Sequence, residues 1–474
     1  MKPTTDKHMI DRAISRLACP LLLAASLALA GCGSLPRIVP DMGIQPAKTI
    51  QIKGGRGILS AEQSQAVLDK FKNAKQENLI LEKHLAVEEA ITGSPLVAGN
   101  KVTLLIDGPA TYASMFSAIR EARDHINMET YIFENDDTGK QFADLLIDKQ
   151  KHGVQVNLMY DSVGTLNTPR EFFQPLIDAG VQVLEFNPVN PALARKGWEV
   201  NQRDHRKLLI VDGTTAFVGG INISSVYSSG SFRKFRKKDD EGKDMAPWRD
   251  TQVRMDGPVA AEFQKMFIDT WEKQHGPQLA ARNYYPKIAS KGGEIVRGIG
   301  SSPEDPYSVI YATFISAIQH AESLVYLTNA YFIPDPQLRA ALKDAVKRGV
   351  DVRLMLPGKS DSALVLYASH SFYTELLEGG VRIYERQDAL LHSKTALIDG
   401  VWSTIGSTNL DWRSFVYNQE INAVILGPQF GAQLQALFDR DLAASKEITL
   451  EAWKDRPISD RMKEFGAGLW ARWL

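Results

Sequence analysis

Two stretches decide the fold of this chain: His205-Arg206-Lys207-Leu208-Leu209-Ile210-Val211-Asp212 and His392-Ser393-Lys394-Thr395-Ala396-Leu397-Ile398-Asp399. Seven residues after each Asp comes a small pair, and an Asn follows three residues after the first member of that pair. These residues are Gly219-Gly220 with Asn222, and Gly406-Ser407 with Asn409. Chance would place one His-x-Lys-x4-Asp pattern in about a few per cent of chains this long. Two copies with the same downstream spacing therefore indicate a duplicated site.

The spacing within each stretch has a physical reading. Side chains two residues apart on a β-strand point to the same face, so His205 and Lys207 face one way together, as do His392 and Lys394. The small pairs allow the backbone to approach a ligand closely, and each Asn supplies amide donors. Two imidazoles, two ammonium groups and two amides that converge on one point suit a phosphate anion.

The duplication extends well beyond the motifs. The segment 117–122 is echoed by 316–321, and 153–158 is echoed by 349–354. Asp250 and Glu420 each stand seven residues before a Gly-Pro pair. Two halves of roughly 180 residues thus look like copies of one fold, related by a pseudo-twofold axis. An active site between such copies would take equivalent residues from both.

From Lys101 onwards, short apolar strands alternate with amphipathic helices, which predicts an α/β fold. The expected strands cover 102–106, 128–133 and 154–160, and the expected helices cover 112–123 and 142–151. We expect two tandem domains, residues 97–285 and 286–450, with mixed β-sheets flanked by helices. A C-terminal amphipathic tail follows at 451–474.

The N-terminus is typical of a secretory signal peptide. Four basic residues precede an apolar run, 17–31, that is shorter than the roughly 20 residues needed to span a bilayer. A membrane-anchor helix is the alternative. The junction Leu29-Ala30-Gly31-Cys32 resembles the bacterial lipobox, which implies that residues 1–31 are removed and that Cys32 is lipidated.

That resemblance implies a lipoprotein of the bacterial cell envelope that meets a membrane surface through its lipidated N-terminus. Gly33, not Asp, follows the cysteine, which favours the outer membrane and a body that faces the periplasm. The other cysteine, Cys19, lacks a preceding apolar run and is the weaker candidate for lipidation. Because Cys19 lies within the residues that are removed, Cys32 has no disulfide partner in the mature chain.

Residues 32–96 are expected to form a tether to about Gly57 and then a helix. Ser60-Ala61-Glu62-Gln63 reads as a capping box that opens this helix, which could run to about Ala90. Two segments leave two readings open. The basic run 232–238 either touches anionic headgroups or is a solvated loop balanced by 239–241. The tail residues Phe465, Leu469, Trp470, Trp473 and Leu474 favour either an interfacial membrane helix or packing onto the body.

The charge of the chain argues against a nucleic-acid partner. The 474 residues carry a formal net charge of −1. Loss of 1–31 removes four basic and two acidic residues, which leaves 51 basic against 54 acidic side chains, a net charge of −3. Nucleic-acid binders usually carry a basic excess. No cluster with metal-ligand spacing lies near either motif, so no metal and no other cofactor is expected.

The paired motifs resemble the HxK(x)4D(x)6G(S/G)xN signature of the phospholipase D superfamily. Within it, Asn201–Gly213 and Trp248-Arg249-Asp250 are most similar to bacterial cardiolipin synthases. The resemblance covers roughly 97–450. It implies two phospholipase D-like domains, phospholipid substrates, and metal-independent transfer through a phosphohistidine. Those synthases often begin with transmembrane helices, whereas this chain has a lipoprotein-like leader.

The resemblance also implies roles for the motif residues. One His attacks phosphorus and the other protonates the departing alkoxide; we assign these steps to His205 and His392, respectively. The groups that would neutralise the non-bridging oxygens are Lys207, Lys394, Asn222 and Asn409. Asp250 and Glu420 are candidates for the carboxylates that orient each His. Asp212 and Asp399 end their strands, where a structural and a chemical role are equally open.

The leading hypothesis is a phosphatidyltransferase that makes cardiolipin from phosphatidylglycerol or phosphatidylethanolamine. The same chemistry with water as acceptor would give a phospholipase D that releases phosphatidic acid. A secreted nuclease is less favoured, because family nucleases tend to be short single-motif dimers. A silent envelope scaffold would not need complete motifs in both halves. The oligomeric state is left open.

Overall fold

The computed structural model describes residues 45–55, 57–193, 198–231 and 246–474. The expected leader, Cys32 and the basic run 232–238 lie outside these ranges. In the part of the chain that is described, no helix is both long and apolar enough to cross a membrane.

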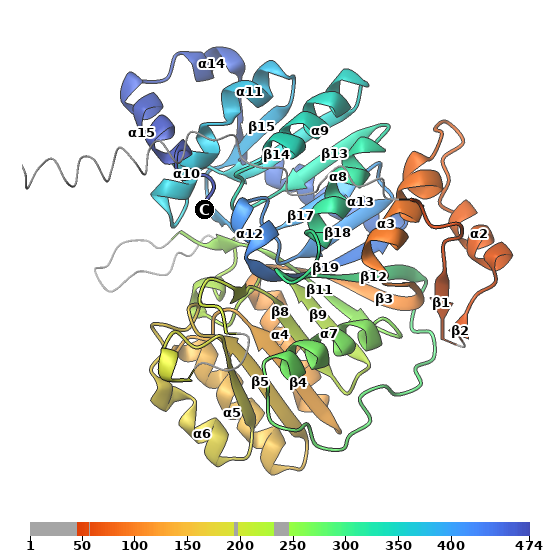
Figure 1. Cartoon of the computed structure of the whole chain (residues 1–474), viewed down its shortest axis with the longest axis vertical. Helices are drawn as coiled ribbons and strands as arrows, with labels where there is room; N and C mark the ends of the chain where they lie inside the picture. The colour runs from red at the N-terminus through yellow and green to blue at the C-terminus, as the bar shows by residue number, and fades with distance from the viewer. Residues whose placement is uncertain (1–44, 56, 194–197, 232–245) are drawn as a thin grey trace, which may run out of the picture.

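One continuous mixed sheet passes through both halves (Figure 1). The first half contributes, in spatial order, β6 (Gln182–Phe186), β5 (Gln155–Asp161), β4 (His125–Thr130), β8 (Lys207–Val211), β9 (Thr215–Gly219), β11 (Thr251–Asp256) and β3 (Leu96–Ile106). The second half contributes, in the same order, β15 (Arg382–Arg386), β14 (Asp351–Pro357), β13 (Leu324–Thr328), β17 (Thr395–Ile398), β18 (Trp402–Gly406), β19 (Asn418–Leu426) and β12 (Glu294–Ser301).

The two halves meet where β3 pairs antiparallel with β12. In each half three strands run parallel and the others antiparallel, and the matching orders confirm the predicted pseudo-twofold α/β architecture. β20 (Ser445–Ile448) extends the second half by pairing with β15.

Helices cover both faces of this sheet, which explains the long apolar runs after each His-x-Lys pair. In the first half, Leu209 and Val211 pack into a core with α4 (Asp107–Glu121) and α5 (Asp137–Lys151). The alternate residues Leu208 and Ile210 face a second core, shared by both halves, with α7 (Ala260–Lys273) and α13 (Pro428–Leu442). A strand buried on both faces needs apolar residues at every position. The second half has its own outer core under α8 (Val309–Gln319) and α9 (Pro336–Lys347).

The N-terminal region differs from its prediction. Ser60 does form a capping box with Gln63 and opens α2, but α2 (Ala61–Asp69) ends 21 residues before Ala90. In the connection that follows, Asn78 adopts a left-handed backbone (φ 59°), and its side chain bonds the backbone of Asn73. Helical structure resumes in a π-turn, Ile80–His84, and continues as α3 (Leu85–Thr92).

Part of the expected tether also joins the body. β1 (Ile52–Gly54) pairs with the start of β3, and Ile52 is buried. A short strand β2 (Gly57–Ile58) closes a hairpin with β1. Any tether therefore ends before Ile52.

Candidate active site

Two short strand pairs cross between the halves and set the position of each histidine. β7 (Arg203–Asp204) runs parallel to the start of β19, with Asp204 opposite Gln419. The next residue on each strand is His205 and Glu420, so these two side chains become neighbours across the halves. The His205 amide donates to the carbonyl oxygen of Gln419 at 3.0 Å.

The second strand pair is the pseudo-twofold equivalent of the first. β10 (Trp248–Arg249) runs parallel to β16 (Leu390–Leu391), with Arg249 opposite Leu391. Asp250 and His392 follow directly, and the His392 amide donates to the carbonyl oxygen of Arg249 at 2.8 Å. Each half thus supplies one histidine to the carboxylate of the other half.

Both histidines contact those carboxylates through Nδ1. Nδ1 of His205 lies 3.1 and 3.2 Å from the two carboxylate oxygens of Glu420, and Nδ1 of His392 lies 2.7 Å from Oδ2 of Asp250. An ionised carboxylate only accepts hydrogen bonds, so each Nδ1 carries the proton. Nε2 of each ring then carries the lone pair, which can attack phosphorus or accept a proton.

The two lysine ammonium groups lie in one buried cluster with the histidines and their carboxylates. Nζ of Lys207 donates to the carbonyl oxygen of His205, and Nζ of Lys394 to that of His392, each at 2.5 Å. Burial lowers the pKa of Lys207 to about 7 and that of Lys394 to about 8, against the attraction of Glu420 and Asp250. The charge of Lys394 also lowers the pKa of Lys207, which places both halves in one electrostatic centre.

The histidines respond to the same burial. Desolvation and the charge of Lys207 lower the pKa of His205 to about 4, and burial and Lys394 lower the pKa of His392. Burial raises the pKa of Glu420, but His205 and Lys207 outweigh it and hold that pKa at about 2. At pH 7 both imidazoles are therefore neutral and Glu420 is ionised.

The small pair after each motif packs against the carboxylate rather than against open space. A Cβ added to Gly220 would stand 2.3 Å from Oδ1 of Asp250. At the equivalent position, the Ser407 hydroxyl donates to Oε2 of Glu420. The sequence predicts that these residues let the backbone approach a ligand, and the structure differs. Gly220 makes room for the carboxylate that orients His392, and Ser407 holds the carboxylate that orients His205.

The two asparagines differ in their surroundings. The Asn222 amide nitrogen donates to the hydroxyl of Tyr227 at 3.1 Å, and its oxygen accepts from the Ile132 backbone. Oδ1 of Asn409 is buried and has no hydrogen-bond partner among the described residues. Asn222 is thus held by the protein through both ends of its amide.

Asp212 and Asp399 are not brought to this centre. The Asp212 carboxylate accepts from the backbone N–H groups of 123–125, and the Asp399 carboxylate accepts from those of 322–324. Each lies at the far end of its strand, roughly 15 to 17 Å from the lysine at the near end. Of the two roles left open by the sequence, this geometry favours the structural one.

Aromatic side chains that the motifs did not reveal surround both histidines. The Tyr131 ring lies 5.1 Å from that of His205, and Trp248, Tyr227 and Tyr331 lie 5.2, 5.9 and 6.4 Å from that of His392. Tyr131 follows β4 directly, and Trp248 stands two residues before Asp250. Their places at the ends of strands next to motif residues were the signal that sequence reasoning passed over.

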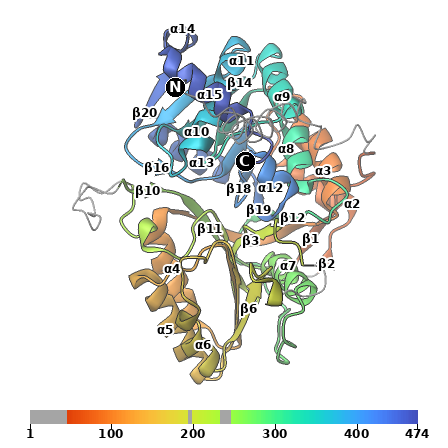
Figure 2. The same cartoon turned by 60° about the vertical axis from the view of Figure 1, so that its left-hand side comes forward.

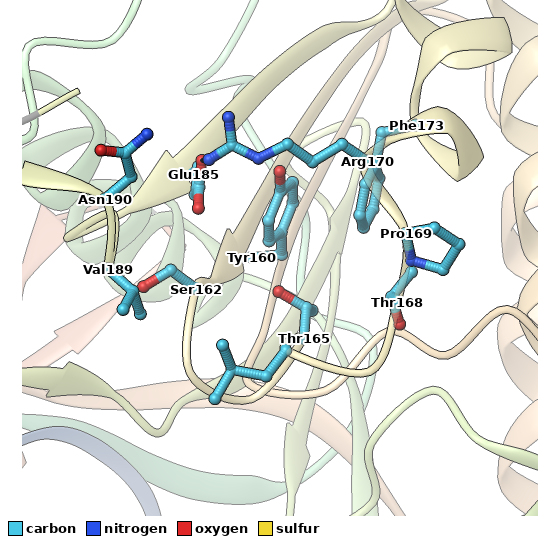
Figure 3. Close-up of a pocket in the computed structure, with 11 residues that line it drawn as sticks. Tyr160, Ser162, Thr165, Thr168, Pro169, Arg170, Phe173, Glu185, Val189 and Asn190 are labelled. Carbon is cyan, nitrogen blue, oxygen red and sulfur yellow. The ribbon is translucent and has the colours of Figure 1, made fainter. Parts of the chain in front are cut away.

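A cleft of about 540 Å³ lies in the first half of the chain (Figure 3). Ser162 in its wall accepts from the Arg203 guanidinium at 2.8 Å, two residues before His205. Gly164, next to the wall residue Thr165, packs on the backbone and ring of Tyr131. An ion pair of 2.9 Å between Arg170 and Glu185 closes part of the rim. Within the described ranges, no group of three or more His, Cys, Asp or Glu side chains is arranged to hold a metal ion.

Comparison with known proteins agrees with this geometry. The family model described as "Cardiolipin synthase, PLD-like domain" matches residues 115–230 and 314–442, one segment in each half. The chain belongs to this family. It is 38% identical to cardiolipin synthase A of Pseudomonas putida (strain W619) over 378 residues, 78% of this chain and 74% of that one.

Two further relatives extend the comparison. A cardiolipin synthase of Alkalihalophilus pseudofirmus is 35% identical over 376 residues, 78% of this chain and 72% of that one. The crystal structure of phosphatidylserine synthase from Haemophilus influenzae matches the fold with a TM-score of 0.60 at 14% identity, over 82% of this chain and 99% of that chain. This member of the family is thus an enzyme of the phospholipase D type with two tandem domains.

Proposed function

We propose that this enzyme is a phosphatidyltransferase that makes cardiolipin from two molecules of phosphatidylglycerol, or from phosphatidylglycerol and phosphatidylethanolamine. One observation carries the proposal: two histidines with free Nε2 atoms, each held by a carboxylate of the opposite half, stand in one cluster with two buried lysines. Its relatives named as cardiolipin synthases support the substrate class.

In the first step, Nε2 of His205 attacks the phosphorus of the donor lipid. A P–N bond forms while the bond from phosphorus to the headgroup oxygen breaks. His392, protonated on both nitrogens, gives its Nε2 proton to the departing oxygen, and the headgroup alcohol leaves. The bound phosphodiester anion favours that protonated state, because a nearby negative charge raises the pKa of an imidazole. Lys207 and Lys394 balance the charge on the non-bridging oxygens.

In the second step, His392 takes the proton of an incoming hydroxyl group. The hydroxyl oxygen attacks phosphorus, the P–N bond breaks, and His205 returns to its neutral form. A hydroxyl of phosphatidylglycerol gives cardiolipin, whereas water gives phosphatidic acid. Exclusion of water from the site decides between these products.

The test is mass spectrometry of lipids after incubation of the purified protein with phosphatidylglycerol in mixed micelles, with phosphatidylethanolamine added to a parallel sample. Cardiolipin and free glycerol, absent with His392→Ala, are the expected products. Phosphatidic acid alone would make the protein a hydrolase. No change in either lipid would reject phospholipids as substrates, and cleavage of DNA by the same preparation would support the nuclease instead.

We also propose that the enzyme is a lipoprotein held on the periplasmic side of the bacterial envelope, at the outer membrane, through acyl chains on Cys32. The lipobox-like Leu29-Ala30-Gly31-Cys32 and the following Gly33 support this. Mass spectrometry of the N-terminal peptide from the membrane fraction should find a diacylglyceryl-modified Cys32. An unmodified cysteine within an intact leader would reject the lipoprotein and favour an anchor helix.

A further inference from the structure

The C-terminal tail leaves a row of large apolar side chains exposed. α15 (Ile458–Gly468) ends the chain together with the turns that follow it. Ile458, Met462 and Phe465 are 74%, 71% and 72% exposed, and Trp470 and Trp473 after the helix are 52% and 63% exposed. Exposed apolar side chains scattered singly need no explanation, but a contiguous group usually marks an interaction site.

The row occupies one face of the helix. Positions 458, 462 and 465 follow i, i+4 and i+7 spacing, which puts them on a single stripe. The opposite face is already used: Ala467 and Ala471 are buried against Ala368 of α10 (Ala363–His370) and Ile333. Packing of the tail onto the body, one of the two sequence-based alternatives, is therefore observed, and the outward stripe stays exposed among the residues that the structure describes.

Ion pairs hold the helix in this orientation. The Arg456 guanidinium lies 2.7 Å from the buried Glu464 carboxylate and stands over the ring of Trp453. Lys463 bonds Asp460 at 2.9 Å and the hydroxyl of Tyr367 on α10 at 3.3 Å. The apolar stripe is thus presented outward by fixed contacts.

Hydrogen bonds link the tail to the chain segment that leads to His205. The carbonyl oxygen of Leu474 accepts from the backbone N–H of Arg413 in α12 (Trp412–Val416). The Arg413 guanidinium in turn donates to the side chain of Asn201 at 3.4 Å, four residues before His205. In both Figure 1 and Figure 2 the C-terminus lies next to α12, with α10 and α15 close by.

A second connection leads to the other histidine. The exposed Asp361, two residues before α10, accepts from the hydroxyl of Tyr331 at 2.8 Å, and the Tyr331 ring faces His392. The tail and the segment before α10 are therefore each connected to residues close to one of the two histidines.

We propose that the stripe Ile458, Met462, Phe465, Trp470 and Trp473 docks on the surface of an anionic phospholipid bilayer. Trp and Phe beside exposed Arg461 and Arg472 suit the boundary between acyl chains and anionic headgroups. The inference rests on the proposed function: a phospholipid with two acyl chains stays in its membrane, so the enzyme must meet it at that surface. Docking through the stripe would bring the histidine-bearing side of the tail's contacts close to the headgroups.

The test measures binding to sedimenting vesicles of equal parts phosphatidylcholine and phosphatidylglycerol. All chains are full length and carry Cys32→Ser, so that no acyl chain attaches there and every variant keeps the same N-terminus. The tail variant is Met462→Ser/Phe465→Ser/Trp473→Ser. The control, Ile58→Ser/Ile177→Ser/Tyr285→Ser, removes exposed side chains far from the tail.

We expect the tail variant to lose roughly tenfold or more in vesicle affinity, and the control to stay within about twofold. Hydrolysis of the water-soluble diester bis(p-nitrophenyl) phosphate should stay unchanged in the tail variant while turnover of lipid in vesicles falls. Vesicle binding equal to that of the parent chain would overturn the proposal. A shift from dimer to monomer with unchanged vesicle binding would also overturn it, and would assign the stripe to a second copy of the chain.

A measurement without a packing change covers the case in which the tail variant misfolds. Brominated phosphatidylcholine in the vesicles should quench tryptophan fluorescence of the parent chain, and Trp470→Phe/Trp473→Phe should lose most of that quenching. Absence of quenching in the parent chain would overturn the proposal. The two proposals fail separately: vesicle binding through the stripe without cardiolipin production rejects only the proposed function.

Discussion

The half-site around His205 and the half-site around His392 share one backbone plan and differ in the side chains that complete it. The carboxylate that faces His392 is the shorter Asp250, which packs against Gly220 where a Cβ would not fit. The carboxylate that faces His205 is the longer Glu420, whose far oxygen accepts from the hydroxyl of Ser407.

Between the two half-sites, the length of the carboxylate side chain and the identity of the small residue beside it therefore differ together: Asp250 with Gly220, and Glu420 with Ser407. An Asp that touches the backbone leaves no room for a side chain, whereas the Glu side chain has one more rotatable bond and needs a partner to fix it. The residue between His and Lys differs as well: Arg206 donates to the carbonyl oxygen of Glu420, while Ser393 bonds the hydroxyl of Thr251. Duplication supplies two histidines, and these local differences allow them to take different roles.

The largest effect is expected from the histidines themselves. His205→Asn and His392→Asn should each lower turnover of phosphatidylglycerol by about 1000-fold or more, because each removes a nucleophile or an acid/base group. A p-nitrophenyl diester separates the roles, since p-nitrophenolate leaves without a proton. His392→Asn should keep a burst of p-nitrophenolate and His205→Asn should show none. The reverse pattern would exchange the two assignments.

The crossed carboxylates should follow. Glu420→Gln and Asp250→Asn keep shape but lose the charge that fixes each tautomer, and we expect losses of about 100-fold or more in kcat. Rapid-quench kinetics with the same diester should show that Glu420→Gln slows the burst, as expected for a partner of His205. Asp250→Asn should leave the burst and slow the later steady phase. Equal effects on both phases would contradict separate roles for the two halves.

The small residues offer a sharper comparison. Gly220→Ser places in the first half the residue that the second half has at the equivalent position, Ser407. Because the new Cβ would meet the Asp250 carboxylate, His392 would be displaced, and we expect a loss of about 100-fold in kcat. Ser407→Gly removes one hydrogen bond and should cost only about fivefold. Calorimetry should record a lower Tm for Gly220→Ser, because overpacking a buried site costs about 1 to 3 kcal/mol, whereas Ser407→Gly should unfold nearer the parent temperature. Losses of equal size would mean that the halves do not differ in this way.

The lysines predict how the rate depends on pH. Each ammonium group is charged below its pKa, so kcat/KM with a soluble diester should fall as pH rises through the values of about 7 for Lys207 and about 8 for Lys394. On the acid side the rate should fall as pH drops through about 4, where His205 takes up a proton. Lys207→Arg keeps its charge at all these pH values and should move the alkaline limit to higher pH. An unmoved limit would assign it to another group.

Much of this architecture could be predicted from local pattern. The repeated His-x-Lys motifs and their downstream Gly and Asn indicated a duplicated fold and one shared site, and alternating apolar segments indicated the α/β class. The exchange of Asp250 and Glu420 between halves could not be predicted, because it depends on the pairings of β7 with β19 and β10 with β16. Each pairing involves two residues per strand and leaves no periodic signal in the sequence.

Other misses have similar causes. The connection after α2 is held by a contact distant in sequence, because the Glu322 carboxylate accepts from the backbone N–H groups of Glu77 and Leu79. Tyr131 and Trp248 reach the histidines only because distant strands end at one edge of the sheet. Interactions between residues close in sequence could be predicted, whereas contacts between residues distant in sequence could be identified only from the structure.

The smallest effect on activity is expected at the carboxylates that close the strands far from the site. Asp212 and Asp399 both adopt a left-handed backbone, with φ 52°, and each accepts hydrogen bonds from three consecutive backbone N–H groups. Asn tolerates that backbone but lacks the charge, so Asp212→Asn and Asp399→Asn should each lower the free energy of unfolding by about 1 to 2 kcal/mol. Calorimetry should record a lower Tm, while kcat should stay within about twofold of the parent value. A large loss of kcat at an unchanged Tm would instead favour the chemical role that the motif alone left open. A difference between the two variants would show that the asymmetry of the half-sites extends to the far ends of their strands.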